Sequence, residues 1–408
     1  MQDLDPLPPT STPPEPAPGV RRKRHDVGRR RRIRRRVLVV FVALLIPVGW
    51  SYARAMLAPG SAPLSARTVE WFKEHGGAST VVWVEKEWYS HHQPPVGGEP
   101  SGGIPVQALP SPSAAAAAHL PPHLATPPPI VPIAPHPLPH EGKWQVVGRT
   151  ADGLPTLRVA YVRPDAVHTS LLTGVMWMDT KLLHPALVAG TQVPGSGSWP
   201  DGFKVPKQAY PALAATFNSG FLLRDSNGGF YLDGRAAAPL ANGQASFVIY
   251  KDGRADIASW GSEVKMTPEV AAVRQNLWLL VDHGRPNPTL SSDSTSTWGA
   301  TFSGGVLVWR SGVGITRDGA LVYAAGPGLS ATSLAQILIR AGAVRAMELD
   351  INTVWTNGYF YTNAAKTPRG FAPHPLLASQ YRPPTRYLVA DERDFFMMLL
   401  RPRFVPKG

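Results

Sequence analysis

The feature that most constrains this chain is a cluster of basic residues placed directly before an apolar segment. Residues 21–36 contain eleven Arg or Lys residues, and residues 37–57 are mostly apolar. A helix over 37–57 would rise about 31 Å, which is enough to cross a bilayer. Positive charge beside such a helix favours the cytoplasmic side. We therefore expect a single-pass protein of the plasma membrane: a disordered basic cytoplasmic arm (1–36), a transmembrane signal anchor (37–57) and an extracytoplasmic C-terminal domain.

Two other interpretations of this N-terminal region remain open. A cleaved signal peptide has the same order of charged and apolar residues, and Ala53-Arg54-Ala55 fits a cleavage site. The basic arm could also bind nucleic acid. However, residues 1–36 carry a net charge of +7 out of a total of +13, so the rest of the chain is only mildly basic. We therefore expect no nucleic-acid partner and assign the arm to membrane lipids, which attract basic residues beside an apolar segment.

The absence of cysteine and the distribution of proline set further limits. Without cysteine the chain has no disulfide framework, zinc–thiolate site, iron–sulfur cluster or cysteine nucleophile. Half of the 44 prolines lie in residues 1–20 and 93–140. Because proline-rich segments form semi-rigid spacers, residues 93–140 are predicted to be a linker. It would separate a short juxtamembrane segment, 58–92, from a globular body, 143–408.

The segment 58–92 is predicted to contain a short helix. Residues 63–76 have an amphipathic pattern, with Ser65 as the N-cap and Gly76 as the residue that stops the helix. The apolar run Thr80–Val84 that follows is predicted to be a strand.

Short apolar runs fill the first two thirds of the body and are separated by hairpin signals. These signals are the pairs Asp152-Gly153, Asp233-Gly234, Asp252-Gly253 and Asp318-Gly319. Near residue 330 the pattern changes to a helix over 334–341, capped by Ser330 or Thr332, and a strand over 344–351. With the strand 320–324 these form a β-α-β unit. The predicted fold class is therefore mixed α/β (α+β), a β-rich single domain with a C-terminal β-α-β unit, preceded by one transmembrane helix and the Pro-rich linker.

Acidic side chains gather at the end of the last strand of this unit. In parallel β-α-β units, ligands bind outside the carboxyl ends of the strands. Glu348, Asp350 and Asn352 lie there at alternate positions, so their side chains share one face. Burying unpaired carboxylates is costly. These residues therefore either serve a ligand or pair with Arg345 or Arg310, and both interpretations remain open.

A second acidic strand end follows the apolar run 277–281. Asp282 and His283 lie there, and a histidine titrates in the range that suits a general acid or base. The alternative is that His283 is an ordinary surface residue at the junction of a strand and a loop.

The order and spacing of three motifs resemble the phosphodiester glycosidase family. They are Asn-x-Gly-Phe beginning at Asn218, Arg-x-Gly-x-Gly beginning at Arg310, and a helix followed by Glu-Leu-Asp ending at Asp350. The resemblance covers about residues 143–390, and it implies that these three residues are the motif Asn, Arg and Asp of the family. Where the family continues from the Asp with glycines and serines, this chain has the bulkier residues Ile351–Trp355.

The resemblance implies a hydrolase that cleaves a sugar-1-phosphodiester at the anomeric carbon. Asp350 would be the nucleophile or the base that activates water, with Glu348 as its partner. Arg310 would stabilise the charge of the phosphate leaving group. The residues expected to contact the substrate are Asn218, Gly220, Asn352, Asp282 and His283.

The expected partner is an anionic or phosphodiester-containing glycan of the cell envelope or surface, and no cofactor is expected. A non-catalytic envelope module that binds a glycan or a protein is the alternative, and the lost glycines favour it. A metal-dependent hydrolase is a third class. It would use oxygen and nitrogen ligands from Asp282, His283, Glu348 and Asp350, although their spacing is not that of a metal motif.

Overall fold

A computed structural model describes residues 21–107, 121–195, 197–292, 298, 307–364 and 366–405. It divides into two compact units, Met1–Ala58 and Pro59–Gly408. Of the arm predicted to be disordered, residues 1–20 lie outside the described residues, whereas residues 21–36 are helical.

The first unit is a single long helix, α1 (Arg21–Leu57). Its part Arg31–Leu57 is long and apolar enough to cross a membrane, and none of the apolar side chains there is buried by the protein. The prediction of one N-terminal apolar helix is therefore confirmed. Length and composition are compatible with a signal anchor and with a signal sequence alike.

The second unit is built from three sheets, in which every strand pairing is antiparallel. The large sheet has the order β1 (Gln145–Ala151), β2 (Leu154–Val162), β3 (Thr173–Met178), β14 (Leu321–Leu329), β13 (Val308–Thr316), β15 (Ala343–Glu348), β11 (Leu279–Asp282), β12 (Arg285–Pro286). A second has the order β7 (Arg235–Ala238), β6 (Phe230–Leu232), β10 (Val270–Gln275), β8 (Ala245–Tyr250), β9 (Ala255–Ser259). The third has the order β17 (Phe371–Pro375), β16 (Gly358–Asn363), β5 (Leu213–Asn218), β18 (Phe395–Leu400), β4 (Leu183–Val188).

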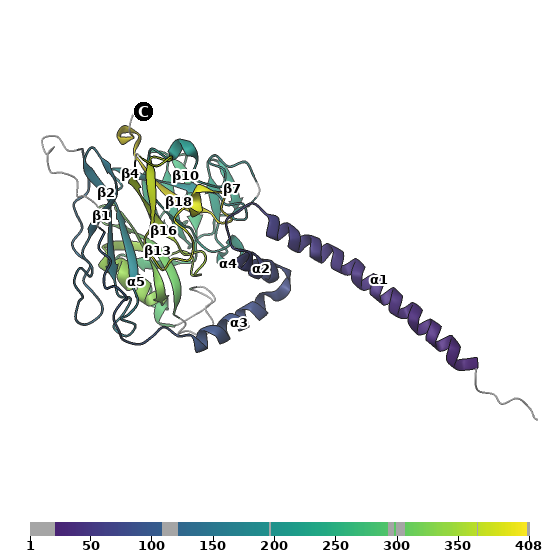
Figure 1. Ribbon diagram of the computed structural model, residues 1–408. Helices are drawn as coiled ribbons and strands as arrows, with labels where there is room; N and C mark the ends of the chain where they lie inside the picture. Colours follow the sequence, from purple (N-terminus) through teal and green to yellow (C-terminus); the bar gives the residue numbers. More distant parts are fainter. Residues whose placement is uncertain are drawn as a thin grey trace, which may run out of the picture. The chain divides into compact units, whose positions relative to one another are not determined.

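Helices are few and short in this unit, as Figure 1 shows. They are α2 (Leu64–Phe72), a π-helical turn (Lys73–Gly77), α3 (Ala78–His91), α4 (Leu223–Ser226), α5 (Ala331–Arg340) and 3-10 turns at Lys207–Ala209, Pro288–Ser292, Arg386–Leu388 and Pro402–Phe404. The predicted β-rich fold class is confirmed.

One apolar core joins the three sheets. A row of aromatic rings crosses it, because Tyr323 of β14 packs on Phe217 of β5, Phe217 on Phe396 of β18, and Phe396 on Phe247 of β8, with ring centroids 4.3–5.4 Å apart. All four side chains are buried. Aromatic pairs at such spacings add to the free energy of burial.

A second core lies between α5 and the large sheet. Leu334 and Ile337 of α5 are buried in one cluster with Val322 of β14. The helix begins as predicted, because Ser330 accepts a hydrogen bond from the backbone N–H of Ser333 and the Ser333 hydroxyl accepts from the N–H of Ser330, which is a capping box.

The β-α-β unit differs from the prediction in one respect. β14 and β15 flank α5 and run in the same direction, but β13 lies between them and is antiparallel to both. The reason is the Asp318-Gly319 turn, which joins β13 and β14 as a long hairpin and leaves only the other edge of β13 for β15. The predicted β-α-β unit is therefore present with β13 inserted between its two strands, and β13 supplies side chains next to the end of β15.

The segment 58–92 is more helical than predicted. Residues 80–84, predicted to be a strand, lie within helix α3, because a short apolar run does not distinguish a strand from part of a helix. The predicted helix over 63–76 exists as α2, but Pro63 occupies the N-cap position instead of Ser65. Gly76 leaves the helical conformation with a φ of 89°, in agreement with the expected stop.

The described parts of the Pro-rich segment 93–140 pack on the body. Leu124 and Ile130 are buried, the Leu124 N–H donates to Oδ2 of Asp179, and the Trp144 indole N–H donates to the Pro128 carbonyl. This differs from the semi-rigid spacer, separate from the body, that composition predicts. The apolar residues between the prolines are buried against the large sheet, and this burial fixes the segment on the body.

We predict that Ile130→Ala lowers the free energy of unfolding by about 2–5 kcal/mol. Ile130 is 2% exposed, so its truncation to alanine leaves a cavity. The matched control is Val131→Ala, which should change it by less than about 0.5 kcal/mol because Val131 is 65% exposed. Denaturant titration measures both values. Equal effects of the two substitutions would mean that the segment is a spacer after all.

Candidate active site

The Asp350 carboxyl lies where β15 ends. The pairing of β13 with β15 continues past the strand end, because the Leu349 N–H donates to the Ser311 carbonyl and the Ser311 N–H donates to the Asp350 carbonyl. The side chain then turns back, and its Oδ1 accepts from the N–H groups of Ile351 (2.8 Å) and Asn352 (3.3 Å). Burial raises the pKa of Asp350 to about 6. None of the described residues donates a hydrogen bond to Oδ2, so that oxygen can serve a substrate or a water molecule.

Glu348, the last residue of β15, forms a buried ion pair with Arg310 of β13. It lies two residues before Asp350 in the sequence. Nη1 of Arg310 lies 2.6 Å from Oε1 of Glu348, and both side chains are nearly inaccessible. Burial raises the pKa of Glu348 to about 7, and the Arg310 charge opposes that rise. The arginine also donates to the carbonyls of Leu329 and Trp298.

Arg310 therefore has a different role from the one predicted. The sequence suggested that it faces a substrate phosphate, but its guanidinium is engaged with Glu348 and with backbone carbonyls. The pairing of Glu348 with Arg310 was the other interpretation left open by the sequence, and the structure supports it. The carboxyl of Glu348 is a buried neighbour of Asp350 that fixes the position of β13.

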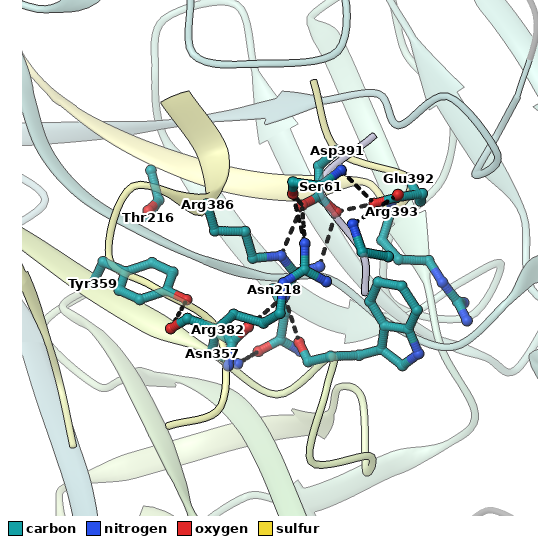
Figure 2. A network of polar contacts seen from close by, with 12 residues as sticks. Ser61, Thr216, Asn218, Asn357, Tyr359, Arg382, Arg386, Asp391, Glu392 and Arg393 are labelled. Atoms are coloured by element: carbon teal, nitrogen blue, oxygen red, sulfur yellow. Dashed lines mark hydrogen bonds and ion pairs between the residues drawn. The ribbon is translucent and has the colours of Figure 1, made fainter. Parts of the chain in front are cut away.

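Asn218 joins four parts of the fold at this site, as Figure 2 shows in part. Its Nδ2 donates to the Ser311 hydroxyl (3.0 Å), and its Oδ1 accepts from the Tyr323 hydroxyl (2.7 Å) and from the Asn357 N–H (3.0 Å). A further bond runs from Nδ2 to the Ser219 carbonyl. With both donors and both acceptor positions used, Asn218 holds the loop that follows Asp350 and does not have a polar atom left for a sugar hydroxyl.

Gly220 is required by a close approach that the sequence did not reveal. A Cβ at this position would lie 2.8 Å from Cγ of Asn276. Asn276 is fully buried, accepts from the Phe221 N–H and donates to the Glu348 carbonyl. It thereby ties the turn after β5 to the end of β15. No sequence motif marks Asn276, because it follows β10 of a different sheet and lies more than fifty residues in sequence from the residues that it joins.

The structure separates Asp282 and His283 from the other candidate residues. β11 is antiparallel to β15, and Val281 pairs with Ala346, so Asp282 lies beside Arg345 at the opposite end of β15 from Asp350. Five residues of strand span roughly 16 Å. The structure therefore does not bring Asp282 and His283 together with Asp350. The predicted Asn352 does lie in the Asp350 turn, where its Oδ1 accepts from the Val354 N–H.

The same separation bears on metal binding. The four ligands considered from the sequence do not meet in the structure, because two lie at each end of β15. A different group, Glu263, Asp282 and His283, comes within 4.8 Å on the surface. The guanidinium of Arg345 already pairs there with Glu263 and Asp282 and supplies a positive charge to both carboxylates.

Four consecutive charged residues before β18 were missed by the sequence analysis. Asp391 forms a two-bond ion pair with Arg386, Glu392 accepts from the Ala62 N–H, and Asp394 pairs with Arg274 at 2.6 Å. Figure 2 shows Asp391, Glu392 and Arg393 gathered beside Ser61, Arg382 and Arg386. A signal for this region was present, because a run of four charges next to the apolar strand Phe395–Leu400 is unusual in a chain with 17% charged residues.

Residues 212–350 match the sequence model of a family described as phosphodiester glycosidase. This segment of the chain is similar to the phosphodiester glycosidase family. The match begins at β5 and ends at Asp350, so it includes Asn218, Arg310 and Glu348, and the resemblance stated from the motifs is confirmed.

Solved structures were also compared with this chain. The catalytic domain of zebrafish N-acetylglucosamine-1-phosphodiester alpha-N-acetylglucosaminidase, auto-inhibited by its pro-peptide, is 14% identical; the match covers 64% of this chain and 88% of that one, with a TM-score of 0.39. A hypothetical protein from Synechocystis is 13% identical over 60% of this chain and 64% of that one, with a TM-score of 0.31. No curated protein matches the sequence.

We predict that Arg310→Met lowers the free energy of unfolding by about 3–5 kcal/mol, because it leaves Glu348 buried without a counter-ion. Chemical denaturation measures the loss, and Arg310→Met combined with Glu348→Leu should recover part of it. Arg345→Met is the control, since its partly exposed pair with Glu263 should contribute less than about 1 kcal/mol. If Arg310→Met is as mild as the control, the pair does not organise the site.

Proposed function

We propose that this chain is a membrane-anchored hydrolase that cleaves sugar-1-phosphodiesters outside the cytoplasm. One observation carries the proposal. The segment that matches the phosphodiester glycosidase family ends on Asp350, whose buried carboxyl is fixed through Oδ1 by two backbone N–H groups. A carboxylate oriented in this way, with a pKa of about 6, is ionised near neutral pH and suited to proton transfer.

The proposed reaction breaks the bond between the anomeric carbon and the phosphate oxygen. Water adds to the anomeric carbon, Asp350 takes the proton of that water, and the electron pair of the broken bond leaves with the phosphate monoester. Alternatively, Asp350 attacks the anomeric carbon directly and water releases the sugar in a second step. A phosphate leaving group is a weak base, so it needs a nearby positive charge more than it needs a proton.

The proposed location follows from α1. Its basic N-terminal part would stay in the cytoplasm, and the β-rich unit would lie outside the plasma membrane. The substrate class proposed is a phosphodiester-containing glycan of the envelope or cell surface. Membrane lipids would contact the apolar helix and the basic arm.

We predict that Asp350→Asn lowers sugar release from aryl esters of hexose-1-phosphates by about 10²–10⁴-fold, because the amide cannot accept the proton. The full chain in detergent is assayed for reducing sugar. Asp252→Asn is the matched control; it lies exposed at a hairpin turn and should keep the wild-type rate.

Two outcomes would contradict the proposal. Wild-type rates in Asp350→Asn would remove Asp350 from the chemistry. Saturable binding of the esters without release of sugar from the wild type would instead assign the chain to the non-catalytic glycan-binding class, which the bulky residues Ile351–Trp355 favour.

We also predict that kcat/KM falls as the pH is lowered through about 6. Asp350 must be ionised to act, and its pKa is raised from 3.8 to about 6, so activity is present above that value and drops about tenfold for each pH unit below it. A profile recorded between pH 4 and 8, with binding of the ester measured in parallel, gives the position of the acid limb. An acid limb near 4 would mean that the group is solvated and is not Asp350.

A further inference from the structure

We propose that Arg393 binds the phosphate group of the substrate, above the ring of Trp355, and that the Glu70 carboxylate holds this place in the structure. The inference deepens the proposed function: it rests on a phosphodiester substrate and names the residue that recognises its charge.

Arg393 is buried without the full set of partners that a buried guanidinium needs. It is 5% exposed, and its Nη2 donates to Oε1 of Glu70 at 3.1 Å. Within the described residues, neither its Nε nor its Nη1 has a hydrogen-bond partner. Buried N–H groups without an acceptor are costly, and more so on a charged group. Such donors indicate an anion that binds there.

The neighbouring Arg386 shows what a satisfied guanidinium looks like in this protein. Its Nε and Nη2 donate to the two oxygens of Asp391 at 2.8 Å, and its Nη1 donates to the Trp355 carbonyl and to Asn357. Arg386 therefore has a structural role. Arg393 lies in the same cluster and keeps two donors unused, which is the feature that separates a binding residue from a structural one.

The position of Arg393 connects it to the chemistry at Asp350. Its guanidinium lies 4.6 Å from the ring centre of Trp355, in the loop that follows Asp350. Of the charges around Asp350, that of Arg393 has the largest effect and lowers its pKa, while Glu70 raises it. An anion on Arg393 would therefore lie over Trp355, five residues along the chain from Asp350.

Glu70 imitates part of a bound phosphate. Its carboxylate lies on α2 and uses one nitrogen of Arg393, whereas a phosphate oxygen pair can accept from two nitrogens of one guanidinium. The same carboxylate is within 4.0 Å of the half-exposed Arg224. Binding of a phosphate therefore requires the Glu70 side chain to move away from Arg393.

Arg310, the residue expected from the motif, already has partners for at least two of its three nitrogens. Its Nη1 and Nε are engaged with Glu348, Trp298 and Leu329 in the folded protein. The positive charge that the leaving group needs is therefore assigned to Arg393, which follows the family match by more than forty residues in the sequence.

Titration of the full chain in detergent with inorganic phosphate, followed by calorimetry, tests the inference. Arg393→Gln should weaken phosphate binding by on the order of tenfold or more, because a charge-assisted contact is lost. Glu70→Gln should tighten it by a similar factor, because the competing carboxylate is gone. The matched control Glu74→Gln, an exposed carboxylate next along the same segment that pairs with Arg224, should change affinity less than about twofold.

Equal phosphate affinity in wild type and Glu70→Gln would overturn the inference, and this variant changes only a partly exposed side chain. Wild-type affinity in a folded Arg393→Gln protein would overturn it as well. Failure of the proposed function looks different: phosphate binds through Arg393, but no sugar is released from the esters. Release of sugar with an unchanged KM in Arg393→Gln would keep the hydrolase and remove Arg393 from substrate recognition.

Discussion

The site depends on the place that β13 takes between β14 and β15. This arrangement puts Arg310 next to Glu348 and puts the backbone of Ser311 against Asp350. A charged pair with almost no exposure to water is stable only while both partners are in register, because either charge alone would be costly to bury. A slip of the strand by one residue would turn Arg310 away from Glu348. The ion pair therefore contributes specificity of register as well as energy, and Asp350 is positioned by the same pairing.

A second set of buried charges holds the surroundings of Asp350 in place. Asp391 and Asp394 each neutralise a fully buried arginine, Arg386 and Arg274. Arg386 in turn donates to the Trp355 carbonyl, so the loop after Asp350 is fixed from both its ends. This loop has bulky residues where the resemblance led us to expect glycines. Its shape is set by side-chain packing and ion pairs, and a site with this wall has less freedom to adapt to different sugars.

The sequence predicted the local features and missed those that depend on distant contacts. The cap of α5 at Ser330, the β-rich body and the position of Asp350 were predicted because they rest on patterns within about ten residues. The partner of Arg310 and the separation of Asp282 from Asp350 depend on strand order, which a single sequence does not encode locally. Glu392 meets Ala62 across 330 residues of sequence. No periodicity or motif links residues so far apart. For the predicted linker, the only local indication that it folds onto the body was the presence of apolar residues between its prolines.

The central claim is that the bond from the anomeric carbon to oxygen breaks, and this can be tested directly. The full chain is incubated with a hexose-1-phosphate ester in water enriched in a heavy isotope of oxygen, and both products are analysed by mass spectrometry. The account predicts the label in the sugar, because water or a glycosyl-enzyme intermediate reacts at the anomeric carbon. Label in the phosphate would contradict it, because water would then have attacked phosphorus and the protein would be a phosphodiesterase acting through a different arrangement of its charges.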